Sequence, residues 1–212
     1  MEVLTLTMNP ALDKSTSAEH IVVEKKLRCK TPSFEPGGGG INVSRALKKL
    51  ECESTACYFS GGYTGELMQK LLEEENITQK TLEMQNWVRE SYTVLDTSRN
   101  DQYRFVMPGP EIQEKEWKKA LETVEQADPA PEILVASGSL PSGVPEDFHA
   151  RLAEVTNKRN IKFILDVSGP PLKKALENKV FLIKPNLNEL IDLSGRRSEE
   201  HTSELQSLLI IS

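Results

Sequence analysis

The chain has 212 residues, of which 38% are hydrophobic and 27% are charged, a composition typical of globular proteins. Its 26 lysines and arginines are outnumbered by 32 aspartates and glutamates, which gives a formal net charge of −6. This acidic balance excludes binding to a nucleic-acid backbone as the main activity. No apolar run approaches the ~18 residues that a membrane-spanning helix needs. The N-terminus lacks the pattern of a secretory signal. We therefore expect a cytoplasmic protein with neither a nucleic-acid nor a membrane partner.

Apolar periodicity predicts strands and helices that alternate along the chain. The predicted strands cover residues 3–8, 54–60, 132–136, 162–167 and 180–183. The predicted helices cover residues 41–50, 114–126, 145–159 and 171–177, with two more beginning near residues 65 and 186. Such alternation predicts an α/β fold, with a parallel sheet, right-handed crossovers and helices on both faces.

Two segments interrupt this alternation. Residues 91–97 and 102–107 alternate between apolar and polar side chains, with Arg99-Asn100-Asp101 between them, as in a β-hairpin. The stretch 14–34 is also rich in alternation and charge. We expect both to form a small β lid, covering about residues 14–34 and 88–107.

Polar turns occur where the predicted strands end or a helix begins, which is where ligands bind in open parallel sheets. These turns are residues 9–13, 36–42, 60–62, 137–141, 166–169 and 184–189. Because they share this position in the fold, we expect them to form one polar cleft.

The glycines Gly37–Gly40 directly precede a predicted helix. Glycine lets backbone N–H groups approach a ligand, and a helix start presents them with the positive end of the helix dipole. The alternative is a flexible turn, but four glycines leading to Asn42 favour a ligand site. A dinucleotide fingerprint fails because Asn42 occupies its third glycine position, and no P-loop Lys follows. A dinucleotide-dependent oxidoreductase is therefore the least favoured function.

Other candidate residues have a structural alternative beside the functional one. Asp13 can accept two sugar hydroxyls or serve as a turn aspartate. Arg89 and Arg104, at the predicted hairpin, can clamp a phosphate or form a solvated face. Asn186 and Glu189 are three residues apart at a helix start, where they can take part in Mg²⁺ binding or form a helix cap.

Five segments, in order, resemble the ribokinase-like (PfkB-type) carbohydrate kinases. They are Asn9–Asp13, Phe34–Ala46, Gln102–Gly109, Ser137–Pro141 and Lys184–Glu189. The resemblance covers residues 1 to about 195 and implies a ribokinase-like fold, incomplete at its C-terminus. The form Glu35-Pro36-Gly37-Gly38-Gly39-Gly40-Ile41-Asn42 is similar to that of family members that phosphorylate fructose 6-phosphate with ATP.

The resemblance implies a role for each matching residue. The sugar phosphate would be bound by Asp13, Gly37, Gly38, Gly39, Asn42, Arg89, Arg104 and Ser139, with Lys26 as a weaker candidate. The ATP phosphates would be bound by Lys184 and Asn186, and Mg²⁺ by Glu189 or Asp166. The resemblance also implies a homodimer formed through the lid. Specificity for tagatose 6-phosphate, or that of a 1-phosphofructokinase, is the alternative within the family.

The catalytic turn of this family, Gly-Ala-Gly-Asp, occurs nowhere in the 212 residues. Its Asp is the base that takes the proton of the acceptor hydroxyl. The stretch Arg197–Ser207 resembles a translated sequencing adapter, so we expect residues 1–196 to form an incomplete kinase domain and 197–212 a non-native tail. We expect no phosphotransfer by the chain as written. A non-catalytic sugar-phosphate binding module is the alternative function.

Overall fold

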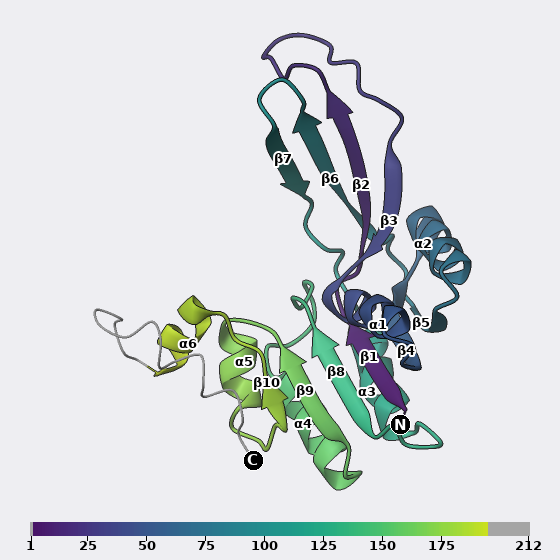
Figure 1. Ribbon diagram of the computed structural model, residues 1–212. Coiled ribbons are helices and arrows are strands. Elements are labelled where there is room, and N and C mark those ends of the chain that lie inside the picture. Colours follow the sequence, from purple (N-terminus) through teal and green to yellow (C-terminus); the bar gives the residue numbers. More distant parts are fainter. Residues whose placement is uncertain (1, 195–212) are drawn as a thin grey trace.

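The strands of the computed structural model form two sheets, and the structure describes residues 2–194. The larger sheet has the order β10-β9-β8-β1-β4-β5, and every neighbouring pair is parallel. Its strands are β1 (Val3–Thr7), β4 (Ser54–Ser60), β5 (Thr78–Glu83), β8 (Ile133–Ser137), β9 (Lys162–Asp166) and β10 (Leu182–Ile183). The smaller sheet is the lid, which projects from this α/β body (Figure 1). The expected fold class is confirmed.

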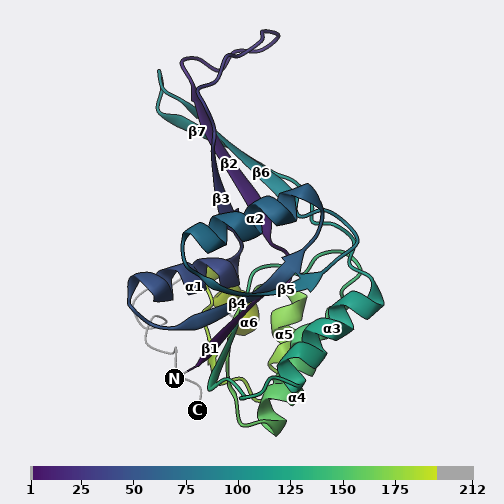
Figure 2. The ribbon, with the colours of Figure 1, turned by 90° about the vertical axis from the view of Figure 1, so that its right-hand side faces the viewer.

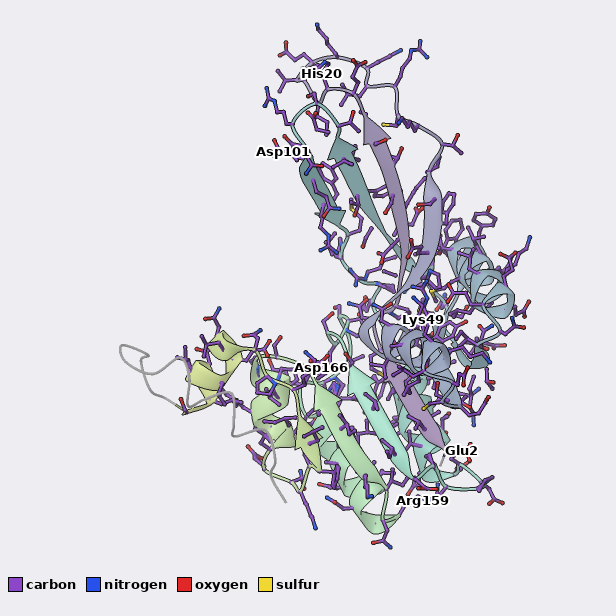
Figure 3. All side chains as sticks on the ribbon, viewed as in Figure 1. Glu2, His20, Lys49, Asp101, Arg159 and Asp166 are labelled. Atoms are coloured by element: carbon purple, nitrogen blue, oxygen red, sulfur yellow. The ribbon has the colours of Figure 1, made fainter. Side chains whose placement is uncertain are left out.

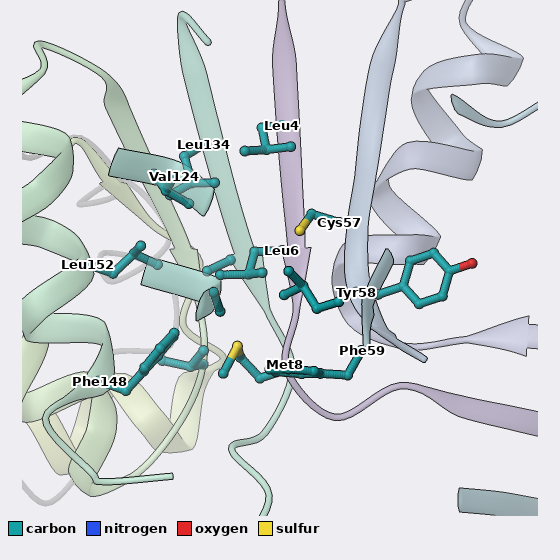
Figure 4. Close-up of a cluster of buried hydrophobic side chains, with 14 of the residues drawn as sticks. Leu4, Leu6, Met8, Cys57, Tyr58, Phe59, Val124, Leu134, Phe148 and Leu152 are labelled. Atoms are coloured by element: carbon teal, nitrogen blue, oxygen red, sulfur yellow. The ribbon is translucent and has the colours of Figure 1, made fainter. Parts of the chain in front are cut away.

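Strand β1 lies at the centre of the body because its side chains are buried on both faces of the sheet. All five of its residues are buried, and it pairs with β4 on one side and β8 on the other. Its Leu4 and Leu6 point into a cluster that also contains Leu134, Phe148 and Leu152 (Figure 4). A short strand that is buried on both faces is typical of the centre of a parallel sheet.

Helices cover both faces of this sheet (Figure 2). Helix α1 (Gly39–Lys49) lies on one face, where Ser44 Oγ is 2.9 Å from Thr5 Oγ1 of β1. Helices α3 (Glu114–Glu125) and α4 (Phe148–Lys158) cover the other face. The remaining helices are α2 (Gly62–Glu74), α5 (Pro170–Ala175) and α6 (Leu187–Ser194). None of the helices among residues 2–194 is long and apolar enough to span a membrane.

The lid is a mixed sheet with the order β3-β2-β6-β7. Its strands are β2 (Ala11–Ala18), β3 (Ser33–Gly37), β6 (Arg89–Asp96) and β7 (Asp101–Val106). The predicted hairpin is confirmed, since β6 and β7 are antiparallel. The connection 19–32 between β2 and β3 lies at the far end of the lid, where His20 is labelled in Figure 3.

One strand of the body was not predicted from the sequence. Strand β5 has the sequence TQKTLE, with only Leu82 buried. It lies at the sheet edge, where only its pairing with β4 is required, so no apolar run marks it. Helix α2 begins at Gly62, earlier than the predicted residue 65, and α4 begins at Phe148, later than the predicted residue 145.

Arg45 connects the lid to the body. It lies on α1, and its Nε donates a 2.6 Å hydrogen bond to Glu75 at the end of α2. Its Nη1 lies 3.7 Å from Glu35 of β3 and donates to the carbonyl oxygen of Pro36. The paired carboxylates raise the pKa of the guanidinium, chiefly through the hydrogen bond with Glu75. One side chain thus ties two helices to a lid strand.

We predict that Arg45→Met destabilises the chain by about 1–2 kcal/mol, because it removes a partly buried, charge-assisted hydrogen bond while keeping the aliphatic stem. Urea unfolding of the purified variant measures this loss. The control is Lys48→Met, an exposed position on the same helix, which we expect to change the stability by less than about 0.5 kcal/mol. Equal stability of the two variants would contradict the prediction.

Burial of His149 in α4 makes the stability depend on pH. The imidazole is 1% exposed, and its ring packs edge-on against Phe148 with centroids 5.4 Å apart. Desolvation lowers its pKa from 6.5 to about 4. Between these values the unfolded chain binds a proton that the folded chain does not, so stability falls as pH falls from 6.5 to about 4. The whole effect is roughly 3 kcal/mol at 1.36 kcal/mol per pKa unit.

We therefore expect His149→Phe to lose this part of the pH dependence, because phenylalanine keeps a ring in the core without a titrating group. The measurement is the free energy of unfolding of wild type and variant at pH 7 and pH 4.5. The control is His20→Gln, at an exposed position of the lid. Identical pH dependence of the stability in wild type and His149→Phe would disprove its assignment to His149.

Candidate active site

The lid and the start of α1 enclose a cleft of about 520 Å³. Six residues proposed from the sequence line it: Asp13, Gly38, Gly39, Asn42, Arg89 and Arg104. They come from lid strand β2, from the glycine turn with the start of α1, and from the hairpin, so three separate segments meet here. We refer to this space as the lid cleft.

Asp13 is the more buried of the two carboxylates that line the lid cleft, the other being Glu35. It lies on β2, paired with Glu35 of β3 and Ser91 of β6. Burial raises the pKa of its carboxyl group, while the positive charges of Arg89 and Arg104 act in the opposite direction. Gly37 lies against this carboxylate, where a Cβ atom would collide with it. The fold thus places the carboxylate of Asp13 close to the backbone of Gly37 and within the field of two arginine side chains.

Arg89 is the fixed cation of the cleft. Its Nη1 donates to the carbonyl oxygen of Met107 at 3.0 Å, and its Nη2 donates to that of Asn9 at 3.5 Å. Its Nε is buried and has no hydrogen-bond partner in the protein, and burial lowers the pKa of the guanidinium. A buried donor without an acceptor is costly, so an anionic ligand that accepts this hydrogen bond would be favoured.

Arg104 is the second cation. It is exposed on β7, opposite Thr93 of β6, and it lines the same cleft as Arg89. An exposed arginine can reorient toward a ligand, whereas the half-buried Arg89 is held by two carbonyl groups. Together they present the planar donors that suit a phosphate group.

The N-terminus of α1 opens on the lid cleft, since Gly38, Gly39 and Asn42 line it. Gly38 has φ +130°, a conformation that other residues rarely adopt. The helix start is fixed by the 3.0 Å hydrogen bond from the amide of Ile41 to Thr7 Oγ1 at the end of β1. The positive end of the helix dipole therefore faces the cleft.

A second polar cluster lies at the carboxyl ends of β8, β9 and β10, where Asp166 is labelled in Figure 3. The Asp166 carboxylate accepts a 2.9 Å hydrogen bond from Ser137 Oγ and lies 3.2 Å from Lys184 Nζ. Asp166 and Lys184, both proposed from the sequence, are therefore direct partners.

Asn186 and Glu189 form a helix cap. The amide of Asn186 donates to Glu189 Oε2 at 2.8 Å, and the amide of Glu189 donates to Asn186 Oδ1 at 3.0 Å. This reciprocal pair is the structural alternative considered for them. Within the described part of the chain, no group of three or more His, Cys, Asp or Glu residues could hold a metal ion.

Three predicted positions lie elsewhere. Ser139 is not in the lining of the lid cleft; its Oγ accepts a 3.0 Å hydrogen bond from Asn9 Nδ2, and it lines a different cavity. Lys26 is exposed in the connection 19–32 and does not line the cleft either. The expectation that the turn 60–62 joins the cleft is wrong, because Gly61 and Gly62 pack against residues 84–87.

Several residues of the lid cleft were missed from the sequence. They are Glu35, Ser91, Thr93 and Gln102, among others. Side chains alternate between the two faces of a strand, and this alternation is the pattern that could have indicated them. Residues 91 and 93 of β6 and residues 102 and 104 of β7 lie on the same face of the lid as Asp13. Only the register between strands shows this, and a single sequence does not give the register.

The chain is similar in sequence to carbohydrate kinases along most of its length. Residues 5–211 match the family described as pfkB family carbohydrate kinase. ATP-dependent 6-phosphofructokinase isozyme 2 of Escherichia coli K12 is 42% identical over 197 residues, which are 92% of this chain and 63% of that protein. The protein of the same name from Mycobacterium tuberculosis H37Rv is 39% identical, over 91% of this chain and 57% of that protein.

A solved structure supports the same relationship. The crystal structure of phosphofructokinase-2 from Escherichia coli in complex with fructose-6-phosphate superimposes with a TM-score of 0.88 at 41% identity. The superposition covers 94% of this chain and 66% of that chain. The chain thus spans less than two thirds of the length of the curated relatives it matches. Because the family match extends over nearly all of the sequence, the chain belongs to the pfkB family of carbohydrate kinases.

Proposed function

We propose that the chain binds the acceptor of an ATP-dependent phosphotransfer in the cytoplasm, and that this acceptor is fructose 6-phosphate, the product being fructose 1,6-bisphosphate. The observation that carries the proposal is the lid cleft, in which two carboxylates and two guanidinium groups line one space. A sugar phosphate has hydroxyl groups for the carboxylate and a phosphate for the guanidinium groups.

The role of each residue follows from its chemistry. Asp13 accepts hydrogen bonds from sugar hydroxyls when it is ionised, and Asn42 can donate or accept one. The unpaired Nε of Arg89 and the exposed guanidinium of Arg104 bind the phosphate that the sugar already carries. Gly37, Gly38 and Gly39 let the backbone pack against Asp13, Thr7 and Ser137, which brings the N–H groups at the start of α1 to the cleft.

The residues proposed for ATP and Mg²⁺ lie at the second polar cluster. Lys184 is 70% exposed as a side chain, so its ammonium group can leave Asp166 for a nucleotide phosphate. Asp166 and Glu189 each offer one carboxylate, which suits Mg²⁺ held largely by water and by phosphate oxygens. When bound, ATP supplies the phosphoryl group and Mg²⁺ neutralises charge on it.

Two alternative functions would use the same lid cleft: phosphorylation of a different sugar phosphate, and binding of a sugar phosphate without catalysis. Tagatose 6-phosphate, or the substrate of a 1-phosphofructokinase, would use the same charges with a different arrangement of hydroxyls. A binding module without catalysis would keep the lid cleft and its charged residues.

We also propose that the lid pairs with that of a second copy. Strand β7 is the edge of the lid sheet, and all six of its residues are exposed. Phe105 and Val106 are 50% and 64% exposed. An edge strand with exposed apolar side chains is suited to pairing with another chain.

The first test is calorimetric titration with fructose 6-phosphate and with fructose. We expect Arg104→Met to weaken binding of fructose 6-phosphate by about 10–100-fold, as for loss of a charge-assisted hydrogen bond, and to leave fructose binding unchanged. Asp13→Asn should weaken binding of both sugars. The matched control is Arg99→Met, an exposed arginine in the turn of the same hairpin. Unaltered affinity of Arg104→Met for fructose 6-phosphate would refute the assignment of the phosphate site.

The second test is turnover. The chain is incubated with ATP, Mg²⁺ and fructose 6-phosphate, and fructose 1,6-bisphosphate is followed by ³¹P NMR. Since the sequence contains no Gly-Ala-Gly-Asp turn, we expect no product above that formed without protein. Product formation by the chain that is lost in Asp13→Asn would overturn this expectation. It would show that the chain transfers the phosphoryl group without a Gly-Ala-Gly-Asp turn.

A further inference from the structure

A second cavity lies beneath the loop 138–141 and shares no lining residue with the lid cleft. Its volume is about 270 Å³, enough for a molecule of a few non-hydrogen atoms up to a single aromatic ring. Its walls come from that loop, from the start of α4 and from the segment that joins β9 to α5. We call it the loop cavity.

The unusual group in the wall of the loop cavity is His149. It lines the cavity, its side chain is 1% exposed, and its Nδ1 is buried without a hydrogen-bond partner in the described structure. Burial lowers its pKa to about 4, so the ring is neutral at pH 7. A neutral imidazole has one donor and one acceptor nitrogen. Leaving one of them unpaired in a core is costly, so a ligand that pairs with the ring is favoured.

The rest of the wall sets the charge and polarity of the ligand. Leu140, Val144 and Val167 supply apolar surface, and Ser168 supplies one hydroxyl group. Glu146, the charged residue of the lining, is paired with Lys174 at 2.8 Å. The one charged side chain of this lining is thus paired with a cation, whereas the lid cleft is lined by two carboxylates and two guanidinium groups.

We propose that the loop cavity is a second ligand site, which takes a small uncharged molecule with an apolar body and one hydroxyl group that hydrogen-bonds to His149. A hydroxyl fits because it both donates and accepts, so it can pair with the ring in either tautomer. The apolar body packs against the leucine and valine side chains, where burial of apolar surface contributes to binding.

The loop cavity also contacts the region of the lid cleft. Ser139 lines the cavity, and its Oγ accepts the hydrogen bond from Asn9 Nδ2. The carbonyl oxygen of Asn9 in turn accepts a hydrogen bond from Arg89 Nη2. A ligand in the cavity is thus two hydrogen bonds away from the fixed cation of the cleft.

The experiment uses phenol and toluene, which have similar size and shape but only one of which has a hydroxyl group. They are titrated into the purified chain with ¹³C-labelled histidine, and the ring signals are followed by NMR. We expect phenol to shift the His149 signals saturably and to leave those of His20 unchanged. Toluene should bind about tenfold more weakly, the difference expected for one hydrogen bond. Equal affinities, or His149 signals that phenol does not move, would overturn the proposal.

Two variants keep the test independent of folding. His149→Phe removes the hydrogen-bonding ring nitrogens, so phenol should fall to the affinity of toluene, as measured by ligand-observed NMR. Val144→Phe narrows the cavity and should abolish binding of both probes while His149 remains. Phenol binding that survives Val144→Phe would contradict the assignment of the site. Neither readout involves sugar binding or turnover, so the outcome is separate from that of the proposed kinase function.

Discussion

The close approach of α1 to the strand ends is the constraint on which the site depends. A Cβ atom on Gly39 would collide with Ser137 at the end of β8, and one on Gly40 would lie 2.6 Å from Thr7 Oγ1 at the end of β1. The helix can therefore begin directly above the sheet only because these residues are glycines. That position brings the helix dipole and Asn42 to the base of the lid. The ligand site is a consequence of backbone packing before any charged side chain is considered.

The charges of the lid cleft are arranged around that helix start. Burial raises the pKa of Asp13 and lowers that of Arg89, so each group is less stable in its charged form than it would be in water. Their mutual attraction opposes both effects. A ligand that brings hydroxyl donors to the carboxylate and an anionic acceptor to the guanidinium relieves both costs at once. These two opposed costs are the physical basis of the sugar-phosphate ligand proposed above.

Much of the fold and several residues of the lid cleft could be predicted from the sequence, for reasons that differ between residues. The central strands and amphipathic helices were found because burial imposes a period on apolar side chains. Gly38, Asp13 and Arg104 were found because local motifs carry them, and Arg89 because it lies beside the predicted hairpin. Strand β5 was missed because an edge strand needs no apolar run. The lid residues Ser91 and Thr93 were missed because only strand register places them beside Asp13. Ser139 was assigned to the sugar pocket, but the fold directs it to another cavity.

The position of Ser139 shows how one loop serves two spaces. The amide of Gly138 donates to the carbonyl oxygen of Asp166, which fixes the loop to the second polar cluster. Ser139 is hydrogen-bonded to Asn9, whose carbonyl oxygen holds Arg89. The Asn9 Oδ1 atom is itself buried without a partner, so this junction has an unused acceptor as well as the unused donor of Arg89. The loop 138–141 is thus linked through Gly138 to the second polar cluster and through Ser139 and Asn9 to the cation that lines the lid cleft.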